Sequence, residues 1–201
     1  LHYLLKLMPP KVDPLAPENV LVFALGATTG AAISGQARIT TVAKSPLTGG
    51  IGDSQAGGFF PAEMKYAGFD AIVFMGKSPK PVYLWMHDGQ AELRDASHLW
   101  GKITGEAEDI LKAELGDEKL EAEIIGPSGE QMVKFAAIMN MANRAHGRTG
   151  MGAVMGSKNL KAIAARGRGK LNIADKAGLA ALAKAGAMRI EEKGGIFGFG
   201  K

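Results

Sequence analysis

Two arginines in a glycine-rich segment are the clearest candidates for ligand binding in this chain. Residues 143–152 read NRAHGRTGMG, with Arg144 and Arg148 four positions apart and glycines interleaved. A guanidinium group matches two phosphate oxygens at once, and glycine lets a ligand approach the main chain closely. The pattern therefore predicts a site for a phosphate-bearing ligand. A solvated basic surface explains the same charges without a ligand.

An earlier segment has the same combination of residues. Residues 49–58 read GGIGDSQAGG and are flanked by Arg38 and Lys44. Five glycines in ten residues cost backbone entropy on folding, which suits a place where the chain turns sharply or meets a ligand. We therefore predict a glycine-rich loop over 49–58 and, with the later segment, two phosphate-bearing groups. A long surface loop without a ligand is the alternative.

Several short strands and helices must position these two segments. Apolar and β-branched runs predict strands, and amphipathic spacing predicts helices. The expected strands cover residues 20–25, 38–44, 69–75, 121–125, 133–139 and 160–165, and a hairpin covers 81–94 with its turn at Asp88-Gly89. The expected helices cover residues 1–7, 60–67, 104–115 and 176–192.

The order of these elements repeats weakly along the chain. Residues 20–75 contain two strands, a glycine loop, a short helix and a strand, and residues 121–165 contain two strands, a glycine loop, a short turn and a strand. We therefore predict an α+β fold with two β-sheets related by a pseudo-two-fold and linked to short helices. The two glycine loops should then lie side by side on one face. Chance similarity between short apolar runs is the alternative.

The composition restricts the chemistry that this chain can perform alone. Its 201 residues include no cysteine, so it offers no thiolate to a metal or an iron–sulfur cluster. The histidines lack metal-ligand spacing and no nucleophile motif is visible, so we expect a hydrogen-bonding or surface role for His146. The net charge of +4 suits an anionic ligand. The absence of cysteine fits a cytoplasmic protein. No apolar run reaches the roughly 18 residues of a membrane span, and no signal peptide is visible.

Longer stretches of the sequence resemble a known family. The segments SPLTGGIGDSQAGGFFPAEMKYAGFDAIVFMGK and NRAHGRTGMGAVMGSKNLKAIAARG are similar to the N-terminal domain of the aldehyde:ferredoxin oxidoreductases, and DPLAPENVLVFALG and LRDASHLWGK agree with it. The resemblance covers nearly the whole chain. It implies a saddle of two sheets that carries two molybdopterins, which hold tungsten or molybdenum through dithiolene sulfurs. A magnesium ion would bridge the pterin phosphates.

The resemblance also implies the residues that bind this cofactor. Carried over by motif, the pterin contacts fall on Arg38, Gln55, Gly57, Arg144, Ala145, Gly147 and Arg148. The backbone carbonyls of Gln55 and Ala145 fall where the family ligates magnesium, and hard oxygen ligands suit that ion. The family usually has asparagine where this chain has Gln55, a change that a carbonyl ligand survives.

For the whole enzyme, the resemblance implies oxidation of aldehydes to carboxylates, with electrons passing through a [4Fe–4S] cluster to ferredoxin. Residues 1–201 are then expected to be the cofactor-binding domain of a larger enzyme, often a homodimer. The cluster-binding domains and the family's glycine-rich start are absent from this sequence, and its glycine-rich end at 194–200 looks trimmed. The isolated chain is expected to be inactive.

Two other functions are compatible with parts of the sequence. A non-catalytic carrier or structural module could keep the same fold, although the intact Arg38, Arg144 and Arg148 favour cofactor binding. The basic stretch 144–170 could bind nucleic acid, but it lacks interleaved aromatic residues and a known motif. We therefore expect neither nucleic acid nor a membrane as a partner.

Overall fold

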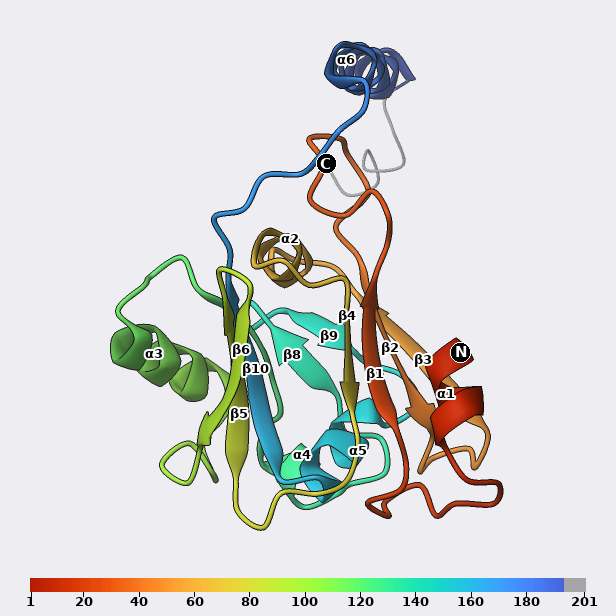
Figure 1. Cartoon of the computed structure of the whole chain (residues 1–201), viewed down its shortest axis with the longest axis vertical. Coiled ribbons are helices and arrows are strands. Elements are labelled where there is room, and N and C mark those ends of the chain that lie inside the picture. The colour runs from red at the N-terminus through yellow and green to blue at the C-terminus, as the bar shows by residue number, and fades with distance from the viewer. Residues whose placement is uncertain (194–201) are drawn as a thin grey trace.

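The computed structural model of the chain describes residues 1–193, in which ten strands form two sheets around a shared core (Figure 1). The first sheet has the order β3-β2-β1-β4, and every neighbouring pair is antiparallel. Its strands are β1 (Leu21–Leu25), β2 (Ile39–Lys44), β3 (Ile51–Ala56) and β4 (Ala71–Phe74).

Alternation along β1 gives the first sheet two buried faces. Leu21 and Phe23 point into the shared core, whereas Val22 packs with Leu4 of helix α1 (His2–Leu7) on the opposite face. Fully burying a side chain of this size stabilises the fold by about 1.5–3 kcal/mol. This sheet is therefore held from both sides.

The second sheet has the order β6-β5-β10-β7-β8-β9, with a parallel pair between β5 and β10 and antiparallel pairs elsewhere. Its strands are β5 (Val82–His87), β6 (Gln90–Asp95), β7 (Glu121–Ile124), β8 (Ile138–Asn140), β9 (Arg144–His146) and β10 (Leu160–Arg166). Helix α3 (Thr104–Leu115) covers one face of this sheet, where Leu111 packs with Tyr83 and Ala122. The helix ends at Gly116, whose φ of 68° is left-handed.

The two sheets contain the same arrangement twice. Strands β9-β8-β7-β10 neighbour one another in the same order as β3-β2-β1-β4, again with antiparallel pairs. Helix α2 (Phe60–Tyr66) precedes β4, and helix α5 (Met151–Ser157) precedes β10 at the equivalent point. The β5–β6 hairpin and α3 lie between the two copies in the chain. The predicted α+β fold of two sheets is confirmed, and this order supports the internal repeat.

The prediction of a loop over 49–58 is wrong, because residues 51–56 form the edge strand β3. The side chains of β3 alternate between exposed and buried, but the buried positions are Gly52, Ser54 and Ala56. A Cβ atom on Gly52 would lie 2.7 Å from the Met151 Cε atom. The core admits only small side chains there, and so no apolar alternation was visible in the sequence.

The expected loop at 143–152 and the short turn after it are also wrong. Residues 144–146 form β9, and α5 begins at Met151. All of α5 is buried, and a Cβ atom on Gly152 would lie 2.5 Å from the Ala137 carbonyl oxygen. Close packing against neighbouring main chain requires glycine in this helix, although glycine lowers helix propensity in a sequence.

Two expected strands are shorter than predicted. The strand expected over 133–139 begins only at Ile138, because Met132 has a φ of 55° and the Ala136 amide closes a turn onto the Val133 carbonyl. The strand expected over 69–75 is β4, whose residues are only partly buried or exposed at the sheet edge. Length and burial at an edge depend on neighbours that a single segment does not reveal.

The hairpin and the last helix agree with expectation, whereas the short helix α4 was not expected. Asp88 and Gly89, with φ values of 45° and 80°, make the turn between β5 and β6. A short helix α4 (Pro127–Glu130) packs against α5, and α6 (Lys176–Lys193) stands away from the two sheets in Figure 1. Glycine-rich residues 194–200 lie outside the described residues. Within residues 1–193, no helix combines the length and apolar character needed to cross a membrane.

Candidate functional site

Edge strands of the two sheets meet along one seam. β3 ends the first sheet and β9 ends the second, and the two strands lie against each other. The Arg148 amide donates to Ser54 Oγ at 3.2 Å, and Ser45 Oγ donates to the Thr149 carbonyl oxygen at 2.7 Å. The two glycine-rich segments, far apart in the sequence, are therefore side by side.

Two hollows open along this seam, and together we call them the cradle. The first has a volume of about 500 Å³, and its lining includes Arg38, Gln55, Gly57, Arg144 and Ala145. The second has a volume of about 530 Å³ and is lined by Asp53, Ser54, Gln55, Ala145, Gly147 and Arg148. The structure thus brings all seven predicted contact residues to one continuous surface, with Gln55 and Ala145 bordering both hollows.

The three arginines of the cradle are available to an anion. Arg38, Arg144 and Arg148 are exposed, and within residues 1–193 none of them forms an ion pair. Arg166 behaves differently, because its guanidinium group lies 2.9 Å from both Glu63 and Asp117. Unpaired guanidinium groups around two hollows suit ligands with phosphate oxygens.

Glycines in these segments fall into two groups. A Cβ atom on Gly57 would meet its nearest atom at 3.5 Å and one on Gly147 at 3.9 Å, which are ordinary contacts, and neither residue has a positive φ. By contrast, Gly150 has a φ of 72°, and an added Cβ would collide with the Lys134 carbonyl oxygen. Packing explains glycine at 150, but neither packing nor backbone conformation requires it at 57 or 147.

Sequence reasoning missed the buried groups that support the cradle from behind. His146 is completely buried, with Nδ1 3.0 Å from the Ser54 carbonyl oxygen and Nε2 3.4 Å from Glu123 Oε2. Asn140, also buried, donates to the Gly57 carbonyl oxygen at 3.1 Å. Of the two roles expected for His146, the structure shows hydrogen bonding and not a surface position. Glu123 and Asn140 carried no motif, and only a polar residue within an otherwise buried strand could have indicated them.

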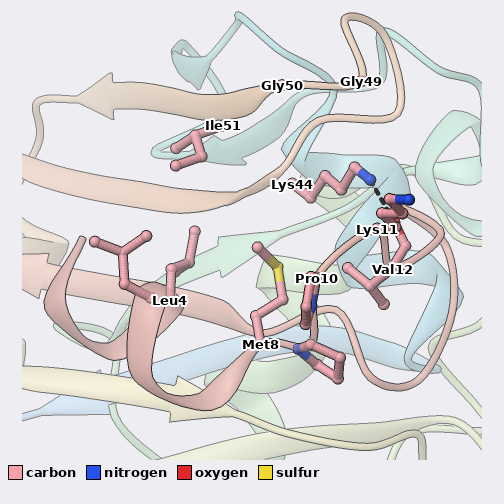
Figure 2. Close-up of a pocket in the computed structure, with 11 residues that line it drawn as sticks. Leu4, Met8, Pro10, Lys11, Val12, Lys44, Gly49, Gly50 and Ile51 are labelled. Carbon is pink, nitrogen blue, oxygen red and sulfur yellow. Dashed lines mark hydrogen bonds between the residues drawn. The ribbon is translucent and has the colours of Figure 1, made fainter.

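A separate pocket between α1 and the β2–β3 turn lacks comparable chemistry. It has a volume of about 400 Å³ and mostly apolar walls, including Leu4, Met8, Val12 and Ile51 (Figure 2). Lys44 lies in its wall, but its amine donates to the Val12 carbonyl oxygen at 2.6 Å. Its lysine is therefore engaged by the wall itself, and the cradle is the stronger candidate.

Comparison with known proteins identifies the family. The model of the family described as "Aldehyde ferredoxin oxidoreductase, N-terminal domain" matches residues 1–167. The chain belongs to this family. It is 53% identical over 176 residues to a tungsten-containing aldehyde ferredoxin oxidoreductase of Pyrococcus abyssi, and 54% identical over 176 residues to the protein of that name in Pyrococcus furiosus. Each match covers 88% of this chain and 29% of the relative.

Relatives with other names share the same domain. An aliphatic sulfonate oxidoreductase, WOR-like subunit, of Pyrococcus furiosus is 40% identical over 173 residues, covering 80% of this chain and 27% of that protein. The solved active site complex BamBC of benzoyl coenzyme A reductase, in complex with 1,5 dienoyl-CoA, matches with a TM-score of 0.92 and 39% identity. That match covers 95% of this chain and 29% of the solved chain. The chain thus spans less than a third of the length of these relatives.

Proposed function

We propose that this chain is the pterin-binding platform of a tungsten or molybdenum enzyme that oxidises aldehydes to carboxylates. In this proposal the two hollows of the cradle each receive one molybdopterin. The pterins contact Arg38, Gln55, Gly57, Arg144, Ala145, Gly147 and Arg148. The main support is the set of three unpaired arginines around two adjoining hollows, in a chain of the aldehyde ferredoxin oxidoreductase family.

The residues present fit such a cofactor. Arginine forks complement phosphate oxygens, and the glycines at 57 and 147 leave the main chain open to a planar ligand where packing does not require it. Gln55 and Ala145 border both hollows, so their carbonyl oxygens would hold a magnesium ion between two phosphates. When bound, the metal–pterin group supplies the two-electron oxidation. The chain's own residues bind it, neutralise its phosphates and fix its orientation.

The rest of the reaction belongs to other parts of the whole protein in this proposal. The chain has no cysteine, so a [4Fe–4S] cluster would be bound by other domains, and electrons would leave through it to ferredoxin. The aldehyde would be selected there as well. The chain on its own should therefore not oxidise aldehydes.

Metal and pterin analysis of the native protein tests the proposal. Cells would be supplied with both tungstate and molybdate, and metal and oxidised pterin would be measured per polypeptide. We expect two pterins for each bound tungsten or molybdenum. A purified, folded protein without pterin would contradict the proposal and favour a structural module that has kept the fold.

A further inference from the structure

Three buried polar side chains lie directly behind the cradle. Glu123 on β7, Asn140 on β8 and His146 on β9 have at most 1% of their surface exposed. Their surroundings include Phe23, whose ring meets the His146 ring edge to face at 6.1 Å. Burying a carboxylate, an amide and an imidazole costs free energy, and apolar residues of similar volume often serve stability as well or better. Stability alone is thus a weak explanation for this cluster.

Hydrogen bonds join the three side chains to both halves of the cradle. Asn140 Nδ2 donates to Glu123 Oε1 at 2.8 Å and to the Gly57 carbonyl oxygen at 3.1 Å. His146 Nδ1 lies 3.0 Å from the Ser54 carbonyl oxygen, and because a carbonyl only accepts, Nδ1 carries the hydrogen. The two anchored carbonyls, of residues 54 and 57, stand on either side of Gln55.

The last link is between the imidazole and the carboxylate. His146 Nε2 and Glu123 Oε2 lie 3.4 Å apart, and neither atom has a hydrogen-bond partner within residues 1–193. The imidazole therefore faces the carboxylate that Asn140 binds, and the three side chains form one contiguous buried group. This group begins next to Ala145 on β9 and reaches the main chain of the β3 segment at the carbonyls of Ser54 and Gly57.

We propose that Glu123, Asn140 and His146 are positioning residues that hold the β3 and β9 segments at the separation that the cofactor requires. The inference rests on the proposed function. β3 and β9 belong to different sheets, so no regular ladder fixes the distance between the carbonyls of Gln55 and Ala145. The buried cluster supplies that constraint through side-chain bonds to main-chain atoms. Its members touch neither hollow, and they act through the residues that do.

A buried ion pair away from the cradle offers a control. Lys161 Nζ lies 2.5 Å from Glu130 Oε1, and both side chains are at most 2% exposed. Glu130 also accepts from the Gly101 amide at 3.0 Å and 2.9 Å. None of these groups belongs to a segment with a predicted cofactor contact. Loss of a buried charge can therefore be compared at the cradle and away from it.

The test measures retained pterin and thermal midpoint in variants of the native protein grown with tungstate. His146→Leu and Glu123→Leu should lower pterin per polypeptide about tenfold, the size typical of lost support behind a bound metal or cofactor. Glu123→Gln should keep near-normal pterin, because its amide still accepts from Asn140 and donates to His146 Nε2. Glu130→Gln should lower the thermal midpoint but leave pterin within about twofold of the wild type.

Each result decides the inference. Wild-type pterin content in both leucine variants would overturn it. The inference would also be overturned if Glu130→Gln lost as much pterin as the leucine variants for the same fall in thermal midpoint. If the leucine variants do not accumulate, Asn140→Ala removes the donor to the Gly57 carbonyl oxygen, and unchanged pterin in that variant would equally overturn the inference. A wild-type protein without pterin would overturn the proposed function and this inference with it. Pterin present in the wild type but insensitive to these changes would overturn the inference alone.

Discussion

Gln55 on β3 and Ala145 on β9 border both hollows of the cradle, although ninety positions separate them in the sequence. The two residues occupy equivalent edge strands of the duplicated arrangement. Duplication therefore places two similar main-chain segments at one central point. A ligand with two similar halves, such as a pair of pterins, matches that arrangement better than a single asymmetric ligand.

Replacing Arg144 with alanine should remove cofactor with little loss of fold. The Arg144 side chain is exposed and has no ion-pair partner within residues 1–193, so few protein contacts depend on it. A hydrogen bond to a charged group contributes roughly 1.5–3 kcal/mol, which corresponds to about tenfold to about a hundredfold in affinity. Pterin per polypeptide, measured after oxidation and extraction, should fall while the thermal midpoint of the protein stripped of cofactor stays near the wild-type value.

Arg168→Ala is the control for the Arg144 substitution. Arg168 is also exposed but lines neither hollow. Its loss should leave pterin content unchanged. Equal losses of pterin in the two variants would mean that net positive charge matters rather than the position of the guanidinium group.

Gly147→Ala should lower pterin content but not stability, whereas Gly150→Ala should lower stability. A methyl group at 147 meets ordinary contacts, so the free energy of unfolding should change by no more than about 0.5 kcal/mol. The same methyl group takes space in the second hollow, and pterin content should fall. At 150 the left-handed backbone and the Lys134 carbonyl oxygen should make alanine cost at least about 1–3 kcal/mol. Denaturant unfolding and pterin content together separate the two cases, and a destabilised Gly147→Ala would contradict the ligand-based explanation.

The sequence carried enough information for the duplicated fold but not for the form of the glycine-rich segments. β1 and β10 are apolar runs whose burial is visible locally, and the Asp88-Gly89 turn follows from its residue types. β3 was missed because its buried positions hold glycine, serine and alanine, and α5 was missed because two of its seven residues are glycines, which lower helix propensity. Such residues lack a hydrophobic signal, and only the close approach of another strand or helix explains them.

The candidate site shows a similar division. Arg144 and Arg148 could be recognised because both lie in one short segment, where their residue type and spacing are visible. Glu123 and Asn140 were not, because their importance comes from contacts with main-chain and side-chain atoms many positions away. Candidate ligand-binding residues can be recognised by their type, whereas the residues that support them are found only from their contacts in the folded structure.

Magnesium binding should survive removal of the Gln55 side chain. In our proposal the ligand at this position is the main-chain carbonyl, which Gln55→Ala retains. The ratio of magnesium to pterin, measured by elemental analysis of the native protein, should therefore stay at the wild-type value. Treatment with EDTA should strip the ion and speed the release of pterin equally in both proteins, because phosphates without a bridging cation repel each other. Selective loss of magnesium in the variant would instead identify the side-chain amide as the ligand.

The stability of the chain should depend on the protonation of Glu121. Burial raises the pKa of the Glu121 carboxyl to about 7, and the nearby Glu108 adds to this effect. Between the unfolded value, about 4.5, and pH 7, the folded state holds a proton that the unfolded state has lost, so the free energy of unfolding falls as the pH rises. Glu121→Gln removes this dependence. The free energy of unfolding of the variant, minus that of the wild type, should be about 1 kcal/mol larger at pH 8 than at pH 5. This value allows for solvent screening of the carboxylate.

Urea unfolding of the 201-residue chain at pH 5 and pH 8 measures this difference. Glu118→Gln is the control, because Glu118 is an exposed carboxylate on the turn before β7 and has no ion-pair partner within residues 1–193. The control should change stability equally at both pH values. The prediction fails if Glu121→Gln has the same free energy of unfolding as the wild type at pH 8. The Glu121 carboxylate of the wild type would then be ionised and solvated in the folded chain, at no cost that a neutral amide could remove.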